Sequence, residues 1–317
     1  MRVLIVTNLT PDPETPQRGR WVMDQVDGIR GHGIDVELFG FPPGRSHYLP
    51  ATRRLRRLLR GRRFDLVHAH FGLAGWCARL AGARPLVVTF HGTDVRHWAS
   101  GRLSRRLAPR LDLCAAVSRT LFAREAGRPG LPRPTGRSAV LPCGPDMTRF
   151  GPRPRAEARS ELGLDPEGSY LLFPADPSRP EKRHDRAAEL ARAAGAELLT
   201  GGSIEPDRMP LWINAANAVV VTSDYEGFGL ATLESLACNV PVLSTPVGIA
   251  PHVLGGLSGC LVGPFEVSSW LDAVRPHLDA ADPRVAGMAR AASLSADRMA
   301  ERVVIAYREM LGSPTSQ

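Results

Sequence analysis

Short apolar runs, each followed by a loop and a helical segment, recur along almost the whole chain. The first half contains six such runs, at Val3–Thr7, Val36–Phe39, Leu66–Ala69, Pro85–Phe90, Leu113–Val117 and Ala139–Leu141. A second series follows at Tyr170–Pro174, Glu197–Leu199, Ala218–Thr222 and Val240–Ser244. Continuous apolar runs of this length are typical of strands that are buried on both faces of a parallel sheet. Their alternation with helices predicts an α/β chain with two doubly wound domains.

The two series are separated by a segment of turn-forming residues, Cys143–Pro152. We therefore expect an N-terminal domain over residues 1–151 and a C-terminal domain over residues 152–296. Residues 297–317 should form a helix that packs back towards the N-terminal domain. Other helices are expected at Ala51–Arg63, Gly72–Ala81, Ser118 to about Ala126, Pro154–Leu162, Arg186–Ala194, Met209–Ala216 and Val267–Leu278.

The composition excludes several classes of protein. No run of eighteen apolar residues is present, and the first apolar run is too short for a signal peptide, so we expect a cytoplasmic protein. Five scattered cysteines without metal-type spacing argue against a disulfide framework and against a zinc site.

Lys182 is the one lysine among 40 lysine and arginine residues. Such a skew indicates a coding bias that replaces lysine wherever the position tolerates arginine. Lys182 is then a position that requires a compact ammonium rather than a planar guanidinium, with chance survival as the alternative.

The segment from Thr222 to Gly248 has the features of an anion site. Its loop contains Gly227 and Gly229 and opens a helix, whose first N–H groups and positive dipole end can face an anion. Glu226 and Glu234 lie eight residues apart in this loop and helix. Carboxylates do not bind an anion, so the hydroxyls of a sugar and of a ribose are their more plausible partners. An ordinary βαβ turn with two incidental glutamates is the alternative.

The nine residues from Glu226 to Glu234, EGFGLATLE, resemble the E-x7-E signature of the retaining GT-B-fold glycosyltransferases of family four. The similarity continues in NVPVLSTPVG, where Asn239 replaces the usual glycine at a helix C-terminus and can adopt its left-handed conformation. Four further segments match in order: the loop with Gly19, His91-Gly-Thr-Asp94, Gly144-Pro-Asp146 with Phe150, and Arg179 with Lys182. The resemblance covers essentially the whole chain. It implies the GT-B fold, in which two Rossmann-like domains face each other across a cleft.

The resemblance implies that the donor is a nucleotide-diphosphate sugar. Arg179 and Lys182 would neutralise its diphosphate, the leaving group, whose charge grows in the transition state. The same phosphates would be approached by Gly19 and by the backbone N–H groups of Phe228, Gly229 and Leu230.

The remaining matched residues would act on the sugars. Glu226 would hold hydroxyls of the donor sugar, and Glu234 would bind the ribose. His91 would lie beside the transferred sugar and stabilise the reacting centre. Asp94 and His70 are secondary candidates on the acceptor side, although Asp94 could instead cap the next helix.

The resemblance also implies a chemical course. In the family, retention is thought to proceed by attack on the face from which the phosphate leaves, and the departing phosphate takes the acceptor's proton. No Asp-x-Asp pair ends a strand, so we expect no metal, and no cofactor besides the donor substrate. An acid–base pair of a glycoside hydrolase is rejected, because it needs no phosphate site.

Two other functions remain open. A nucleotide-sugar epimerase or hydrolase on the same fold would turn over the donor without an acceptor. A non-catalytic basic protein would bind a membrane or nucleic acid, and nucleic acid is disfavoured because no aromatic residues interleave with the arginines. The acceptor is equally open between a glycan, a lipid-linked glycan, a polysaccharide precursor and a secondary metabolite.

Arginines cluster in the first half, within Arg53–Arg63 and at Arg102, Arg105, Arg106 and Arg110. They could face an anionic membrane as a peripheral contact, which suits a lipid-linked acceptor. A helix packed by its leucines, with the arginines in water, is the alternative.

One segment departs from the family pattern. Members usually carry another strand–helix unit between the positions of Gly201 and Gly202 and the segment before Glu226, and here only Ser203 to Trp212 intervenes. That unit helps to hold the nucleobase in the family, so the identity of the base, and of the donor, stays open.

Overall fold

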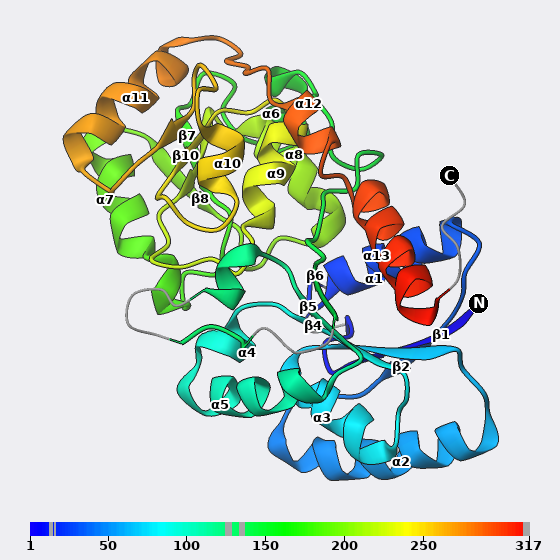
Figure 1. Cartoon of the computed structure of the whole chain (residues 1–317). Coiled ribbons are helices and arrows are strands. Elements are labelled where there is room, and N and C mark those ends of the chain that lie inside the picture. The colour runs from blue at the N-terminus through cyan, green and yellow to red at the C-terminus, as the bar shows by residue number, and fades with distance from the viewer. Residues whose placement is uncertain (13–14, 16, 124–128, 133–136, 313–317) are drawn as a thin grey trace. The chain divides into compact units, whose positions relative to one another are not determined.

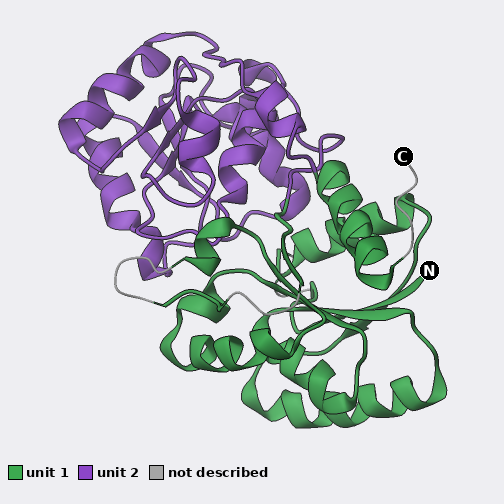
Figure 2. Cartoon of the chain, in the orientation of Figure 1, with its two compact units in different colours: residues 1–143, 296–317 green, residues 144–295 purple. Residues whose placement is uncertain are grey.

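The structure is a computed structural model that describes residues 1–12, 15, 17–123, 129–132 and 137–312. It consists of two compact units, shown in green and purple in Figure 2. The first unit comprises Met1–Cys143 together with Ala296–Gln317, and the second comprises Gly144–Ser295. Each unit is a parallel sheet covered by helices, which confirms the predicted α/β class.

The sheet of the first unit has the strand order β2-β1-β3-β4-β5-β6, and every neighbouring pair is parallel. Its strands are β1 (Arg2–Thr7), β2 (Asp35–Gly40), β3 (Leu66–His70), β4 (Leu86–Phe90), β5 (Leu113–Ala116) and β6 (Arg137–Val140). The chain leaves β1 for β2 on one side and then crosses to β3 on the other. The carboxyl ends of β1 and β3 therefore flank the point at which ligands of such sheets bind.

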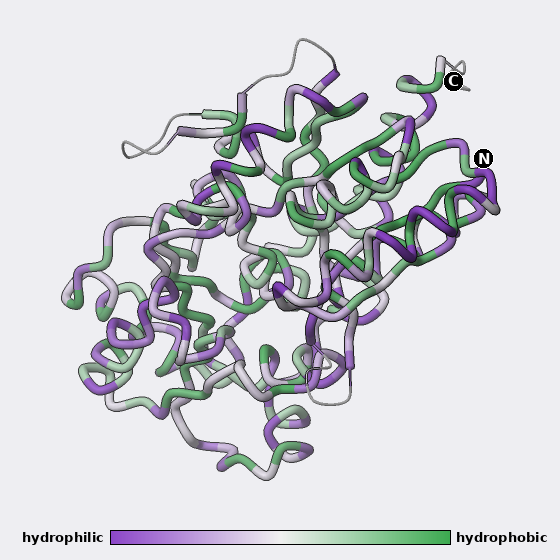
Figure 3. Tube along the Cα trace, turned by 90° about the horizontal axis from the view of Figure 1, so that it is seen from below, coloured by the Kyte–Doolittle hydropathy of each residue, from purple (hydrophilic) through white to green (hydrophobic). Residues whose placement is uncertain are grey.

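Alternate residues of these strands face opposite layers of helices. Figure 1 shows α1 (Arg20–Gly31) and α13 (Ala296–Leu311) on one face of the sheet, and α2 (Tyr48–Gly61), α3 (Gly72–Ala81) and α5 (Trp98–Leu107) on the other. Val3, Ile5, Leu66 and Val87 pack with the first pair of helices in one core cluster. The strands appear as hydrophobic stretches in Figure 3, while polar and apolar residues alternate along helices such as α2.

The sheet of the second unit has the order β11-β10-β9-β7-β8, again entirely parallel. Its strands are β7 (Tyr170–Phe173), β8 (Glu197–Thr200), β9 (Ala218–Val221), β10 (Val242–Ser244) and β11 (Leu261–Val262). The reversal of strand order lies between β7 and β9. The loops that leave these two strands are thus neighbours at the carboxyl edge, whatever their distance in sequence.

The helices of the second unit also form two groups. Side chains of α7 (His184–Ala194) and α11 (Val267–Asp279) share a core cluster with β7, β9 and β10. A second group consists of α6 (Arg155–Leu162), α8 (Met209–Ala215), α9 (Leu230–Ala237), α10 (Ala250–Leu254) and α12 (Met288–Ala292). Between β8 and β9 the chain forms a single 3-10 turn, Pro206–Arg208, and α8.

The strand predictions agree with the structure to within two residues at each end, but one predicted helix is wrong. Instead of a helix from Ser118 to about Ala126, the structure has a short 3-10 helix over Arg119–Phe122, and Ala123 is extended. Residues 124–128 lie outside the described part of the chain. The helices α4 (Thr93–Arg96), α5, α10 and α12 and the two-residue strand β11 were also not among the expected elements. Among the described residues, no helix has the length and apolar content needed to span a bilayer.

The contact between α1 and α13 depends on a missing side chain. A Cβ at Gly28 would lie 2.8 Å from the Cβ of Ala300, whereas a Cβ at Gly31 in the same helix would meet nothing within 4 Å. Gly28→Ala should lower the free energy of unfolding by about 1 kcal/mol, because overpacking costs about 1–3 kcal/mol and helix propensity returns only part of it. Urea-unfolding midpoints measure this effect.

Gly31→Ala is the matched control and should not lower the midpoint. In an Ala300→Gly background the cost of Gly28→Ala should disappear, because the opposing methyl group is gone. An equal loss in both backgrounds would contradict the close helix contact.

Candidate functional site

The loops after β7 and β9 are joined by the side chain of Thr222, which directly follows β9 and is fully buried. Its hydroxyl lies 3.1 Å from the carbonyl oxygen of Lys182 and 2.9 Å from that of Arg183. The backbone N–H of Asp224 donates to the carbonyl of Glu181 at 2.9 Å. The 3-10 turn η4 (Pro180–Lys182) is therefore held against the loop that carries Glu226.

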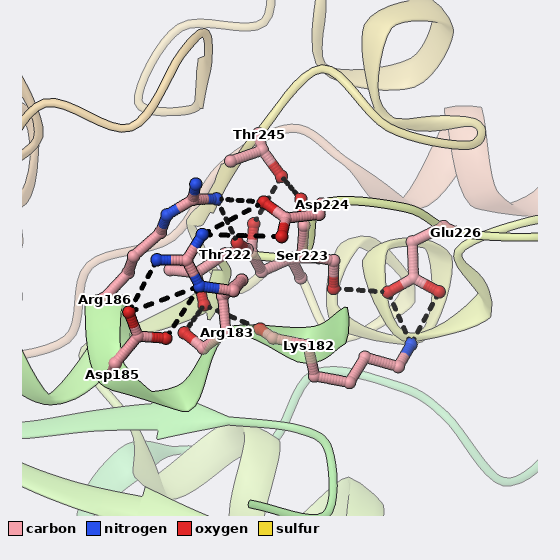
Figure 4. Close-up of polar contacts among 10 residues, drawn as sticks. Lys182, Arg183, Asp185, Arg186, Thr222, Ser223, Asp224, Glu226 and Thr245 are labelled. Atoms are coloured by element: carbon pink, nitrogen blue, oxygen red, sulfur yellow. Dashed lines mark hydrogen bonds and ion pairs between the residues drawn. The ribbon is translucent and has the colours of Figure 1, made fainter. Parts of the chain in front are cut away.

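This attachment brings Lys182 and Glu226 together (Figure 4). The Lys182 Nζ donates to both carboxylate oxygens of Glu226, at 2.6 and 2.7 Å. The hydroxyl of Ser223 donates to Glu226 Oε1 at 2.8 Å. The two charged side chains are only 12% and 13% exposed, so their mutual pairing is weakly screened by solvent.

The neighbouring arginines have partners of their own. Arg179 donates through Nε to Glu181 at 2.9 Å, on the surface. Arg183 adopts a left-handed backbone conformation, with φ of 54°, and its hydrogen bond lowers the pKa of Asp185. Figure 4 shows this second group, in which Arg183 and Arg186 both reach Asp224, on the other side of Thr222 from Lys182.

The N-terminus of α9 follows Glu226 directly. Gly229 caps the helix with φ of 93°, a conformation that L side chains rarely adopt. The first N–H groups of a helix have no intrahelical acceptor, so those of Gly229 and Leu230 are available at this end. Phe228 is buried beneath them, and Glu234 lies one turn into the helix and is partly buried.

The C-terminus of the same helix confirms the expectation for Asn239. Its φ is 56°, in the left-handed region. The side-chain Oδ1 also accepts the backbone N–H groups of Gly287 at 3.2 Å and Met288 at 2.9 Å. Asparagine therefore provides the helix stop and additionally attaches α12, which glycine could not do.

The first unit places His91 directly after β4 and His70 at the end of β3. His70 Nδ1 lies 3.0 Å from His91 Nε2, so one imidazole donates to the other. His70 is 1% exposed, and its other ring nitrogen has no hydrogen-bond partner among the described residues. The His91 ring stacks on Phe71 with centroids 4.5 Å apart and also contacts Trp21 at 4.9 Å.

A third histidine, His68, extends this group towards the C-terminal helix. Its ring stacks on His70 with centroids 4.6 Å apart. Its Nδ1 lies 2.5 Å from the hydroxyl of Tyr307 in α13, and its Nε2 lies 2.8 Å from that of Thr89. The sequence analysis missed His68, although residues two apart in a strand share a face and His68-Ala-His70 follows this pattern.

Asp94 fastens the loops at the ends of β3 and β4. Its carboxylate accepts the backbone N–H groups of Gly72, His91 and Gly92, at distances of 2.9 to 3.0 Å. Burial raises the pKa of Asp94 to about 6, and these hydrogen bonds oppose the rise. It lies inside the short helix α4 (Thr93–Arg96), whose cap is Gly92, so the alternative role of Asp94 as the helix cap is wrong.

Burial keeps all three imidazoles in their neutral form. It lowers the pKa of His70 to about 3, and it lowers the pKa of His91 well below the usual 6.5, with His70 adding to the effect. His68 is shifted in the same direction for the same reason. At neutral pH, His91 therefore presents an uncharged ring that can donate or accept one hydrogen bond.

Position 19 requires glycine for a reason that lies within the first unit itself. Its φ is 66°, and a Cβ would lie 2.0 Å from the carbonyl oxygen of Leu9. Glycine is therefore needed for the loop between β1 and α1 to close, independently of any ligand. Its predicted approach to the donor phosphates stays a prediction.

Arginines occur along α2 and directly after it, at Arg62 and Arg63. Arg56 donates to the Leu80 carbonyl at 2.6 Å, and Arg62 donates to Glu37 at 2.9 and 3.0 Å. Leu55 is fully buried beneath them, as expected for a helix packed by its leucines. All seven arginines of this stretch are exposed: Arg53, Arg54, Arg56, Arg57, Arg60, Arg62 and Arg63.

The two parallel sheets with sites at their carboxyl ends define a GT-B-type chain, and comparison with known proteins agrees. Residues 1–149 match the family described as Glycosyltransferase Family 4, and residues 176–279 match the family described as Glycosyl transferases group 1. A D-inositol 3-phosphate glycosyltransferase from Actinosynnema mirum is 31% identical over 305 residues, which cover 77% of this chain and 72% of that protein. The chain therefore belongs to the group 1 glycosyltransferases of family 4.

Other similarities are more distant. The protein of the same name from Gordonia bronchialis is 29% identical over 287 residues. These cover 74% of this chain, which spans only 62% of the length of that relative. Among solved structures, Anabaena HepE in complex with UDP and glucose has a TM-score of 0.71, with 17% identity and coverage of 98% of this chain and 100% of that one. The GT-B fold expected from the sequence is confirmed by this likeness.

The buried histidines should make the first unit sensitive to acid. Folded His70 takes up its proton only near pH 3, whereas in the unfolded chain the pKa is near 6.5. Between these values the unfolded state holds more protons, so stability falls as pH falls, by about 1.4 kcal/mol per pH unit for one such group. Asp94, with its raised pKa, acts in the opposite direction between pH 3.8 and about 6.

The measurement is the slope of unfolding free energy against pH between pH 6 and 5. In a His70→Asn variant this slope should be smaller than in the wild type by about the contribution of one proton. His47→Asn changes an exposed histidine of the same unit and should keep the wild-type slope. Identical slopes for His70→Asn and the wild type would show that His70 is not held neutral by burial.

Proposed function

We propose that the protein is a retaining, metal-independent glycosyltransferase that moves a sugar from a nucleotide-diphosphate sugar to an acceptor hydroxyl. Family membership supports transfer of a sugar, and the UDP and glucose bound by the similar Anabaena protein support a nucleotide-sugar donor. The observation that carries the proposal is the Lys182–Glu226 pair at the strand-order reversal of the second unit.

The pair offers a cation for the leaving group and a carboxylate for the sugar. An ammonium has three N–H donors, so Lys182 can turn towards a phosphate oxygen and still keep one bond to Glu226. As the bond from the anomeric carbon to the phosphate oxygen breaks, negative charge grows on the diphosphate. Lys182, Arg179 and the N-terminus of α9 stabilise that charge.

Glu226 then accepts hydrogen bonds from hydroxyls of the donor sugar, and Glu234 does so from the ribose. The N–H groups of Phe228, Gly229 and Leu230, together with Gly19, approach the phosphates. This arrangement neutralises the leaving group with protein cations, and we propose that the reaction needs neither a metal ion nor a cofactor besides the donor.

The first unit supplies the acceptor side in this proposal. His91, neutral and supported by His70 and Asp94, lies beside the transferred sugar and hydrogen-bonds to it without competing with Lys182 for the phosphate. The acceptor hydroxyl attacks the face from which the phosphate departs and passes its proton to that phosphate. No protein nucleophile is required. The exposed arginines of α2 would hold the enzyme at an anionic membrane surface of the cytoplasm if the acceptor is lipid-linked.

Replacing Lys182 should remove transfer more strongly than it weakens donor binding. Lys182→Arg keeps the charge but not the tetrahedral ammonium, and kcat should fall by about 100-fold or more, as for the loss of one stabilising donor at an oxyanion. Donor binding is measured by thermal shift with UDP-, GDP-, ADP- and TDP-sugars, and turnover by release of the nucleoside diphosphate. Arg192→Lys changes an exposed arginine of α7 and serves as the matched control.

The same assay separates the rival functions. Release of nucleotide that is unaffected by any acceptor would favour a nucleotide-sugar hydrolase, and isomerisation of the donor sugar would favour an epimerase. If no nucleotide sugar raises the melting temperature, the glycosyltransferase proposal fails and a non-catalytic basic protein becomes the better account.

A further inference from the structure

A pocket of about 720 Å³ lies within the first unit, at the carboxyl end of its sheet. Its walls come from the loop after β1, the turn before α2 and the first residue of α2, the loop after β3 with the start of α3, and α4 and α5. Phe71 and Asp94 line it, and both contact His91, by ring stacking at 4.5 Å and by a hydrogen bond of 3.0 Å to the His91 backbone. The pocket has the size of a small-molecule site, and two of its lining residues contact the residue proposed to lie beside the transferred sugar.

Apolar atoms make up most of the pocket lining. Leu9, Phe71, Leu73 and Leu103 contribute large apolar side chains from three separate segments. Because these segments are fastened at the ends of strands or within helices, the apolar surface is preformed. A ligand with an apolar body would fill it without reorganising the backbone.

Some polar atoms in the lining are paired within the protein, whereas the buried Oδ1 of Asn8 has no hydrogen-bond partner among the described residues. The hydroxyl of Tyr48 accepts a hydrogen bond from Asn8 Nδ2 at 3.1 Å. The Asp94 carboxylate is occupied by three backbone N–H groups. Among the described residues that line the pocket, Arg45 is the one lysine or arginine, and it is exposed. A phosphorylated polyol would need several charged donors for its phosphate, and this described lining offers one cationic side chain.

The apolar surface continues outside the pocket. Trp98 is 74% exposed and stands between the pocket residues His97 and Ala99. Leu49, 59% exposed, directly follows Tyr48 at the start of α2. Large apolar side chains exposed beside an apolar pocket are typical of a binding surface for an apolar ligand.

We infer that the acceptor of this protein is an alcohol with an apolar body, rather than the inositol phosphate for which its curated relatives are named. The apolar body fills the pocket between Leu9, Leu73 and Leu103, and the hydroxyl lies towards Phe71 and Asp94, the lining residues that contact His91. This inference rests on the proposed glycosyltransferase function. A membrane lipid alcohol and a soluble aromatic alcohol share this chemistry.

Binding to the intact protein tests the inference without requiring turnover. Isothermal titration in the presence of UDP uses three probes: 2-naphthol as a soluble aromatic alcohol, farnesol in detergent micelles as a lipid alcohol, and D-inositol 3-phosphate. We expect at least one of the first two to bind and the third not to. Binding of naphthol alone identifies a soluble acceptor, and binding of farnesol alone identifies a lipid one, and either result supports the inference.

Leu103→Ser tests whether the probe occupies this pocket. Leu103 is 37% exposed, so the substitution should leave the fold intact while making the lining polar. It should weaken binding of the alcohol by about tenfold, in line with the loss of a few methylene contacts in an apolar site. Leu80→Ser, on α3 and outside the pocket lining, is the matched control and should bind as the wild type does.

Three results would overturn the inference: no binding of either alcohol, binding of inositol phosphate alone, or equal affinities of the Leu103→Ser variant and the wild type. All three leave the proposed function untouched, because that function is decided by the thermal shift with nucleotide sugars. Failure of the thermal shift, conversely, does not alter the affinity of the pocket for an alcohol.

Discussion

The hydroxyl of Thr222 is the contact on which the second unit's site depends. It bridges to the carbonyl oxygens of Lys182 and Arg183, and it does so from the first position after the central strand β9. A parallel sheet brings the carboxyl ends of β7 and β9 together, but the two irregular loops that follow them could still adopt several relative positions. The hydrogen bonds from the buried Thr222 side chain hold the two loops in one relative position, because leaving a buried hydroxyl without a partner costs about 1–3 kcal/mol.

In the first unit, the candidate site residues are held in position by the burial of neutral rings. Three imidazoles form a continuous group from Tyr307 in α13 through His68 and His70 to His91. Burial makes protonation costly, so the group stays uncharged and its members interact by stacking and by hydrogen bonds rather than by charge. The C-terminal helix therefore takes part in positioning His91, although the two are remote in sequence.

Much of the fold was predictable because most strands are continuous apolar runs and the helices between them have amphipathic faces. The missed elements lack these signals. In α5, read as WASGRLSRRL, three arginines and two serines obscure a short apolar stripe, and β11 has only two residues. The helix expected after Ser118 was wrong because its residues form only one 3-10 turn before the chain becomes extended at Ala123.

The sequence pointed to Lys182, Glu226, His70 and His91 as candidates, but not to the contacts between them. Lys182 and Glu226 are 44 residues apart, and their contact depends on β9 lying next to β7, an order that local patterns do not encode. His68 and Tyr307 are 239 residues apart. Their contact likewise depends on tertiary packing that local sequence patterns do not encode. The unusual retention of one lysine pointed to Lys182, but nothing in the sequence indicated that its partner is the first glutamate of the E-x7-E segment.

The pairing of Lys182 with Glu226 explains how such a site can exist without its substrate. A lone ammonium or a lone carboxylate at this depth would carry a desolvation penalty, whereas the pair compensates itself. A nucleotide sugar presents a negative diphosphate beside neutral hydroxyls, which match a cation and an acceptor placed side by side. In the proposed site, binding would replace a hydrogen bond between the two side chains by bonds to phosphate and hydroxyl groups, without exposing an unpaired charge. The compact, three-donor ammonium permits this exchange, and this accounts for a lysine at a position where the chain otherwise uses arginine.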